Sequence, residues 1–273
     1  MVHNHDMTGE DDLKVLLIAG GSGSRAKPFS QYTPKPMISL DGRPIIDHIL
    51  RYLARFPEIE SFVIVCEFDD HGKQIINYFE GKERIVGRQI VFVEDKKNGT
   101  GGAILNAETE IGRDESFIVW FADNMCALDI GSFVKQYKFL NESQKNHGKK
   151  MIGMVVTRDY RREETGRIVC DPNETNRIME FTEKPFTKLD LPETLGIYIF
   201  SNTLFSFISK QRDSSNIGNS IDLSFDILAK LPSLGFGLYS YPISNRIDWI
   251  DVESPVYAER NKELVKRILA QMG

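Results

Sequence analysis

Short apolar runs alternate with helical patterns along the first half of the chain. The runs are rich in valine, isoleucine and phenylalanine, and they occupy residues 15–19, 62–65, 90–93 and 117–121. Their length and composition indicate buried strands. Between them, residues 44–56 place isoleucine and leucine on one helical face, and helical patterns recur at 70–79 and from about Thr100. This alternation predicts a three-layer α/β fold, with helices on both faces of a mainly parallel sheet.

The pattern changes after Lys149. Four strand-like segments follow one another with little helix between them, at residues 151–157, 167–170, 178–182 and 195–200. Such a succession indicates an antiparallel extension of the sheet and not a separate domain.

The last part of the chain has a helical pattern. Short helices are expected at 202–210 and 221–231, and an amphipathic helix from about Pro255 to Leu269. No hexapeptide repeat is present, so no C-terminal β-helix is expected. The sequence therefore predicts a flexible leader at 1–12 and a single domain at 13–273.

Composition and charge narrow the function classes. The chain has 273 residues and a formal net charge of −5, which disfavours a long duplex-binding surface and a nucleic-acid partner. Three widely spaced cysteines, Cys66, Cys126 and Cys170, favour reduced structural thiols over a disulfide framework. The sequence has no secretory signal and no apolar run approaching the ~20 residues that cross a bilayer, so we expect a cytoplasmic protein without a membrane partner.

A glycine-rich segment with several prolines follows the first apolar run directly, at residues 19–37. Its candidate nucleotide-binding residues are Ala19, Gly20, Gly21, Gly23, Ser24, Arg25 and Lys35. Glycines let the backbone turn sharply and bring N–H groups close to an anion, while the two cations add fixed positive charge. The loop can therefore hold a triphosphate and stabilise the charge that develops when pyrophosphate leaves.

Two better-known phosphate motifs are excluded for this loop. Gly21, Gly23 and Ala26 match the spacing of the dinucleotide fingerprint, which requires a helix to begin inside the motif. Prolines at 28, 34 and 36 forbid a continuous helix here. The Walker pattern fails as well, because no Gly-Lys-Ser/Thr is present.

The segment resembles the signature GGxGxRxxP…PKP of the sugar-phosphate nucleotidylyltransferases, and the resemblance runs from Lys14 to about Leu269. It implies a Rossmann-like single domain and Mg²⁺-dependent in-line attack of a sugar 1-phosphate oxygen on the α-phosphorus of a nucleoside triphosphate. Arg25 and Lys35 would then be catalytic. The chain departs from the pattern at Ala26 and at Phe29-Ser30, which affects loop packing more than charge.

Two aspartates are the candidate metal ligands and complete the candidate catalytic set. Asp123 follows the strand-like run at 117–121, and Asp251 lies in a segment similar to the family's W-x-D-[VT]-G-[ST]-P, with Glu253 in place of glycine. By resemblance both hold Mg²⁺, a cation that prefers hard oxygen ligands. The alternative is that each aspartate caps a helix, which for Asp251 would be the helix beginning near Pro255.

The sugar-phosphate side is also assigned by resemblance. Gly166 lies in a segment similar to the family's Y-G-x-[IV], and Gly196 in one similar to N-x-G-[IV]-Y. Glu183 and Lys184 match the family's E-K-P. A carboxylate accepts hydrogen bonds from sugar hydroxyls and an ammonium neutralises phosphate, so Glu183 would bind the sugar and Lys184 its phosphate.

Glu94, Gly99 and Thr100 lie in the segment that corresponds to the family's base-binding loop. An ionised carboxylate only accepts hydrogen bonds, which favours guanine, then cytosine, over uracil or thymine. The sequence Gly-Thr-Gly-Gly-Ala-Ile also resembles the loop of mannose and heptose 1-phosphate guanylyltransferases. The alternative is that Glu94 points to solvent and the backbone reads the base, which leaves glucose 1-phosphate uridylyl-, thymidylyl- and cytidylyltransferases open.

Two other classes remain as alternatives. A nucleotide-sugar glycosyltransferase usually carries Asp-x-Asp, whereas Asp123-Asn-Met125 lacks the second aspartate. A non-catalytic nucleotide-sugar-binding paralogue is favoured by Ala122 and Glu253 but opposed by the retained cations and carboxylates. Several family members are homo-oligomers, and the sequence does not identify an interface.

Overall fold

The computed structural model describes residues 13–21, 23, 26–82, 84–85, 87–112, 116–163, 166–170, 172–173, 177–183, 185–214 and 220–273. The expected leader at 1–12 and the site candidates Ser24, Arg25 and Lys184 lie outside these residues.

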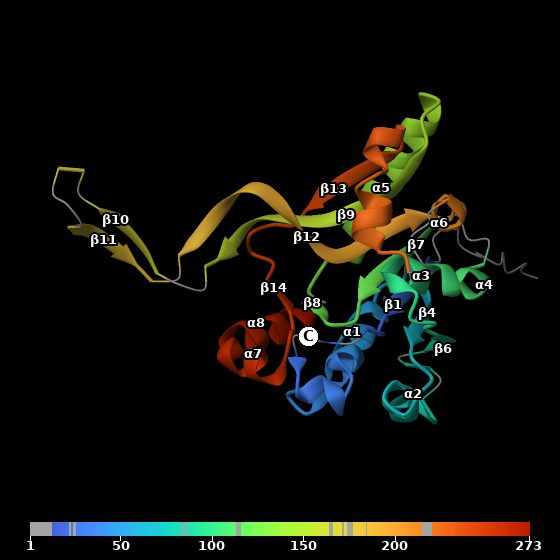
Figure 1. Ribbon diagram of the computed structural model, residues 1–273, viewed down its shortest axis with the longest axis horizontal. Coiled ribbons are helices and arrows are strands. Elements are labelled where there is room, and N and C mark those ends of the chain that lie inside the picture. Colours follow the sequence, from blue (N-terminus) through green and yellow to red (C-terminus); the bar gives the residue numbers. More distant parts are fainter. Residues whose placement is uncertain are drawn as a thin grey trace, which may run out of the picture.

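An eight-stranded sheet forms the centre of the molecule, in the order β13-β9-β12-β7-β1-β4-β6-β5 (Figure 1). Its strands are β1 (Leu13–Ile18), β4 (Ile59–Cys66), β5 (Arg84–Ile85), β6 (Arg88–Glu94), β7 (Ser116–Phe121), β9 (Met151–Arg162), β12 (Phe186–Ser201) and β13 (Gly237–Pro242). The neighbours β7, β1, β4 and β6 are parallel, β12 is antiparallel to both β7 and β9, and β13 is parallel to β9. The predicted parallel sheet with an antiparallel extension is confirmed.

Helices cover both faces because the central strands are apolar on both sides. In β1, Val15 and Leu17 join one core cluster and Leu16 and Ile18 the other, as the two-residue period of a strand requires. The first cluster includes side chains of α1 (Ile45–Leu53), α2 (Lys73–Phe79), α5 (Ile130–Asn146), α7 (Pro255–Arg260) and α8 (Lys262–Met272). The second includes side chains of α3 (Gly99–Asn106), α4 (Glu108–Ile111), α6 (Thr203–Ser214) and the π-helix η4 (Leu223–Leu228).

Three helices differ from the sequence prediction. The expected C-terminal helix is broken at Asn261 into α7 and α8. The segment 221–231 forms the π-helix η4, capped by Asp222, whose carboxylate accepts hydrogen bonds from the backbone of Ser224 and Phe225. Finally, α2 begins only at Lys73, because the Asp69 carboxylate accepts from the N–H groups of His71 and Gly72 and holds a turn before it.

The strand-like segments 167–170 and 178–182 do not extend the main sheet as expected. They form β10 (Arg167–Cys170) and β11 (Ile178–Thr182), which pair with each other in a separate two-stranded sheet. Figure 1 shows this sheet at the end of a ribbon that leaves the main body. We call the described residues of 158–193 the arm.

The remaining short elements lie around the main body. The two-stranded pairs are β2 (Ser39–Leu40) with β3 (Arg43–Pro44) and β8 (Asn124–Cys126) with β14 (Trp249–Asp251), and the 3₁₀ turns are η2 (Phe29–Gln31), η3 (Lys35–Met37) and η5 (Pro232–Leu234). No described helix is long and apolar enough to cross a membrane.

The three cysteines are free, as predicted. Cys66 and Cys126 are buried, and burial raises the pKa of each thiol to about 12, whereas Cys170 is exposed on the arm. The two buried thiols are therefore protonated at neutral pH and act as small apolar core residues.

Candidate active site

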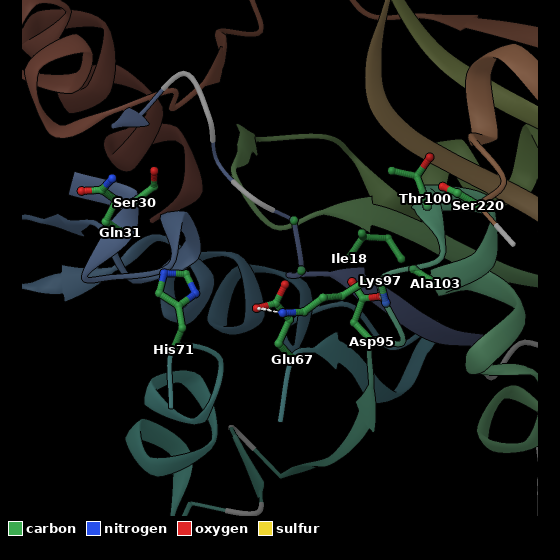
Figure 2. A pocket seen from close by; sticks show the side chains of 13 residues that line it. Ile18, Ser30, Gln31, Glu67, His71, Asp95, Lys97, Thr100, Ala103 and Ser220 are labelled. Carbon is green, nitrogen blue, oxygen red and sulfur yellow. Dashed lines mark hydrogen bonds and ion pairs between the residues drawn. The ribbon is translucent and has the colours of Figure 1, made fainter. Parts of the chain in front are cut away.

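A cavity of about 550 Å³ opens beside the carboxyl ends of β1, β4 and β6 and the beginning of α3 (Figure 2). Its walls are formed by Ile18, Gly20, Gly21, Ser30, Gln31, Glu67, His71, Asp95, Lys97, Gly99, Thr100, Ala103 and Ser220. Open parallel sheets bind ligands at this edge, where strand ends leave backbone groups without sheet partners. The cavity is large enough for a nucleotide-sized ligand.

The glycine-rich loop forms one wall of the cavity. Ala19 still follows β1, because its N–H donates to the Val65 carbonyl at 2.9 Å. A side chain on Gly20 would overlap the Asp95 carboxylate, and Gly21 has a φ of +117°, which strongly favours glycine. The Ser30 hydroxyl donates to the Gly23 carbonyl at 2.7 Å and ties the loop to η2. The loop therefore lines the cavity with backbone atoms at Gly20 and Gly21, where no side chain separates the chain from a ligand.

The opposite wall is the beginning of α3. Gly99 has a φ of +84°, and a Cβ there would overlap the Ile221 carbonyl. The Thr100 hydroxyl accepts from the Leu223 N–H at 2.8 Å and lies 3.3 Å from the Asp222 carboxylate. Packing against the segment before η4 therefore fixes both predicted residues at the cavity.

Asp123 and Asp251 are brought together by the pairing of β8 and β14. Asp251 pairs with Asn124 in this ladder, and the Val252 N–H donates to the Asp123 carbonyl at 2.9 Å. The Lys35 ammonium lies 3.4 Å from Asp123 Oδ2, and the Asn124 amide donates to Asp123 Oδ1 at 3.1 Å. Lys35 and Asp123, which are far apart in the sequence, are therefore in contact, and the strand that carries Asp251 runs beside them.

The helix-cap alternative does not describe either aspartate. A strand, β8, follows Asp123 directly. The N-cap of α7 is Ser254, whose hydroxyl accepts from the Tyr257 N–H at 3.1 Å, while Asp251 ends β14. Both carboxylates therefore require another explanation.

The two carboxylates, on neighbouring backbone segments, are oxygen donors of the type that Mg²⁺ takes. Hard oxygen ligands are what this ion requires, and Mg²⁺ commonly takes one or two protein carboxylates plus phosphate oxygens and water. Among the described residues, no group of three or more His, Cys, Asp or Glu side chains gathers as a metal site. The remaining ligands would have to come from substrate and solvent.

Gly196 lies beside Asn124, whereas Gly166 and Glu183 belong to another part of the chain. Gly196 has a φ of +69°, and a Cβ there would lie 2.9 Å from the Asn124 amide. Gly166 and Glu183 are close to each other, since a Cβ on Gly166 would lie 3.0 Å from Glu183 Oε2. Both belong to the arm, which Figure 1 shows extending away from β8 and β14.

Glu94 is exposed at the end of β6 and does not line the cavity, whereas the next residue, Asp95, does. Asp95 accepts the Lys97 N–H at 2.9 Å. Asp95 is therefore a cavity carboxylate that the sequence motif, which points to Glu94, does not identify.

Three more cavity residues come from the end of β4 and the turn after β6. The Lys97 ammonium lies 3.3 Å from Glu67 and 3.1 Å from Asp69 (Figure 2 shows the Glu67 pair). The Gly72 N–H and then Lys97 lower the pKa of the Asp69 carboxyl to about 2. His71 Nε2 is buried and has no hydrogen-bond partner among the described residues. The rule that ligands bind at strand ends identifies Glu67, since 62–65 is predicted as a strand, whereas His71 falls inside the helix predicted at 70–79.

The match to known proteins covers the same region as the site. The family model described as "Nucleotidyl transferase" matches residues 14–252. This chain belongs to the nucleotidyl transferase family. A solved structure of HddC from Yersinia pseudotuberculosis covers 92% of this chain and 98% of its own chain, with a TM-score of 0.63 and 20% identity, and it shows the shared fold.

The relatives of this chain in the family carry different names. A mannose-1-phosphate guanyltransferase of Aspergillus oryzae is 30% identical over 72% of this chain and 51% of its own length. The bifunctional protein GlmU of Methanocaldococcus jannaschii is 26% identical over 94% of this chain and 55% of its own length. The chain thus spans about half the length of these relatives.

Proposed function

We propose that this chain transfers a nucleoside monophosphate from a nucleoside triphosphate to a sugar 1-phosphate and releases pyrophosphate. The observation that carries the proposal is the ion pair between Lys35 and Asp123, next to the strand that carries Asp251. A cavity lined by Gly20 and Gly21 of the glycine-rich loop accompanies it. A glycosyltransferase has no need of the Pro34-Lys35-Pro36 segment, and a purely binding paralogue has no need of paired carboxylates.

The triphosphate would lie along the glycine-rich loop with its base in the cavity. Backbone N–H groups of Gly20, Gly21 and Gly23 would donate to phosphate oxygens, and such groups need no reorganisation when charge develops. Asp123 and Asp251 would hold Mg²⁺, which neutralises and orients the α-phosphate. Lys35, already 3.4 Å from Asp123, supplies a fixed positive charge at the same place, and Arg25 would assist the departure of pyrophosphate.

The sugar 1-phosphate would enter from the side of Gly196. Its phosphate oxygen attacks the α-phosphorus, the bond to the bridging oxygen of pyrophosphate breaks, and no proton needs to be removed from an ionised phosphate. Gly196 lets the ligand approach the Asn124 amide closely. Gly166 and Glu183 would contact the sugar and Lys184 its phosphate.

For the base we propose guanine, with mannose or heptose 1-phosphate as the sugar class. Carboxylates accept the paired N–H donors of guanine, and they meet two repelling carbonyls in uracil or thymine. Glu94 is the carboxylate indicated by the sequence and Asp95 the one that lines the cavity. The named guanyltransferase relative supports this choice.

The test is kcat/KM for pyrophosphate release with each of five triphosphates, for wild type, Glu94→Gln and Asp95→Asn. Each variant replaces one acceptor-only carboxylate by an amide that also donates. We expect wild type to prefer GTP by about tenfold or more, since a hydrogen bond to a charged group contributes roughly 1.5–3 kcal/mol. The variant at the base-reading position should lose that preference in favour of UTP or dTTP.

The two variants are matched controls for each other, because we expect only one of the two adjacent carboxylates to face the base. A wild-type preference for UTP or dTTP would contradict the guanine assignment. An unchanged ranking in both variants would show that neither carboxylate reads the base.

A further inference from the structure

Trp249 lies where the root of the arm meets the pair of strands β8 and β14. Its indole N–H donates to the Leu195 carbonyl at 3.1 Å, one residue before Gly196. The same residue begins β14, the strand that ends at Asp251. One side chain therefore links the backbone beside a candidate sugar-side residue to the strand that carries a candidate metal ligand.

The Leu195 carbonyl lies in an irregular part of β12. The register of β12 against β9 shifts between Thr194 and Tyr198, and neither Leu195 nor Gly196 has a partner residue in the described strands β7 and β9. Leu195 is buried, and Gly196 has a φ of +69°. A buried carbonyl without a strand partner needs another donor, and the Trp249 indole supplies it.

The pair of β8 and β14 is too short to fix its own register. Each strand has three residues, and together they form a separate two-stranded sheet, which is marginally stable at best in water. At one end of the pair the Val252 N–H donates to the Asp123 carbonyl at 2.9 Å. At the other end Trp249 is held by the root of the arm. The position of Asp251 opposite Asn124 therefore depends on contacts at both ends.

Arg158 holds the Trp249 ring from the arm. Its guanidinium lies over the ring, 4.5 Å from the ring centre. The guanidinium also pairs with Glu193, the partner of Arg158 in the ladder of β9 and β12. The Arg158 side chain is only 21% exposed, and partial removal from water strengthens the attraction between a cation and an indole. Arg158 therefore restricts the orientation of Trp249.

We propose that Arg158 is a positioning residue that acts through Trp249. By fixing the indole, it keeps Gly196 and Asp251 in the relative position that the reaction needs. The proposal rests on the proposed function for the roles of these two residues. It gives the root of the arm a task in catalysis that requires no contact between Arg158 and the reacting atoms.

The test is the steady-state kinetics of Arg158→Met. Methionine keeps an apolar side chain but lacks the guanidinium that covers Trp249 and pairs with Glu193. Small displacements of reacting groups are costly, so we expect kcat to fall about tenfold or more. The KM for sugar 1-phosphate and the Mg²⁺ concentration for half-maximal rate should both rise. The KM for the triphosphate should change less than about twofold, because other segments line the cavity.

The matched control is Arg161→Met. Arg161 lies on β9 as well and pairs with Glu193 at 3.9 Å and with Glu163 at 3.7 Å, whereas it is Arg158 that covers the Trp249 ring. The control therefore removes a charge and ion pairs from the same ribbon, and it should keep wild-type kcat and KM values. Equal kinetics of the two variants would overturn the positioning role.

A double-mutant cycle separates action through Trp249 from direct binding of a phosphate by Arg158. Trp249→Phe keeps an aromatic ring but removes the donor to Leu195. If Arg158 acts through Trp249, adding Arg158→Met to Trp249→Phe should lower kcat by less than about a further twofold. If the two losses multiply, Arg158 acts independently of Trp249 and the proposal is wrong.

The indole N–H signal of Trp249 provides a readout that does not depend on turnover. The chain has two tryptophans, and Trp249→Phe assigns the signal in a ¹H–¹⁵N spectrum. In Arg158→Met this signal should shift and its proton should exchange faster with solvent, whereas Arg161→Met should leave both unchanged. An unchanged signal in Arg158→Met would overturn the proposal. Absence of turnover by wild type with every pair of substrates would contradict the proposed function instead, and the indole signal would still decide whether Arg158 holds Trp249.

Discussion

Asp123→Asn and Asp251→Asn should each lower kcat by about 10²-fold or more without unfolding the chain. Each substitution keeps the size of the side chain but removes one of the two negative charges that would hold Mg²⁺. In Asp123→Asn the Lys35 ammonium also loses its partner at 3.4 Å and becomes free to turn towards the phosphates. A 10²-fold loss corresponds to about 2.7 kcal/mol of transition-state stabilisation.

The measurement is steady-state pyrophosphate release together with thermal unfolding of each variant. The matched control is Asp41→Asn, in the exposed turn between β2 and β3, where asparagine tolerates the φ of 47°. It should keep wild-type turnover. If either site variant folds and turns over at a near-normal rate, that aspartate is not a metal ligand.

Gly99→Ala should raise the KM for the triphosphate at least about tenfold and lower the free energy of unfolding by about 1–3 kcal/mol. The backbone at Gly99 has a φ of +84°, and the added methyl would overlap the Ile221 carbonyl. That carbonyl accepts the Gly101 N–H at 2.9 Å, so relief of the overlap separates α3 from the segment that positions it. The wall of the cavity at Thr100 would move with it.

The control for this prediction isolates backbone strain. Gly42 has a φ of +80°, but a Cβ there would meet no atom within 4 Å. Gly42→Ala should therefore lower stability by about 1 kcal/mol and leave KM unchanged. Equal effects of both substitutions on KM would show that the contact with Ile221 does not shape the site.

The sheet and its helices could be predicted because local patterns specify them. Each residue of the run at 15–19 is apolar, which fits a strand buried on both faces, and β1 has both faces covered. The order of strands in the sheet could not be predicted in the same way, because a two-residue period identifies a strand but not its neighbours. The pattern at 167–170 and 178–182 therefore predicts strands but not their partners. In the structure these strands pair with each other in the arm and not with the main sheet.

Sequence motifs identify the segments that carry the candidate catalytic residues. They do not determine which of two adjacent carboxylates lines the cavity. Lys35, Asp123 and Asp251 come from three segments that the structure places next to one another, and their catalytic roles stay predictions. Glu94 and Asp95 are adjacent carboxylates, and a shift of one residue at the end of β6 determines which of them lines the cavity. Serine followed by proline is a common helix start, so Ser254-Pro255 in the sequence already indicates that Ser254, and not Asp251, caps the helix.

The central claim is nucleotidyl transfer to a sugar phosphate, and ³¹P nuclear magnetic resonance of a reaction mixture tests it most directly. The chain is incubated with Mg²⁺, each triphosphate in turn, and mannose, heptose or glucose 1-phosphate. The account predicts that one mixture gives pyrophosphate and a nucleoside diphosphate sugar in equal amounts, and that omission of either substrate abolishes both signals. A nucleoside diphosphate with a sugar bisphosphate, or no product from any pair, would contradict it.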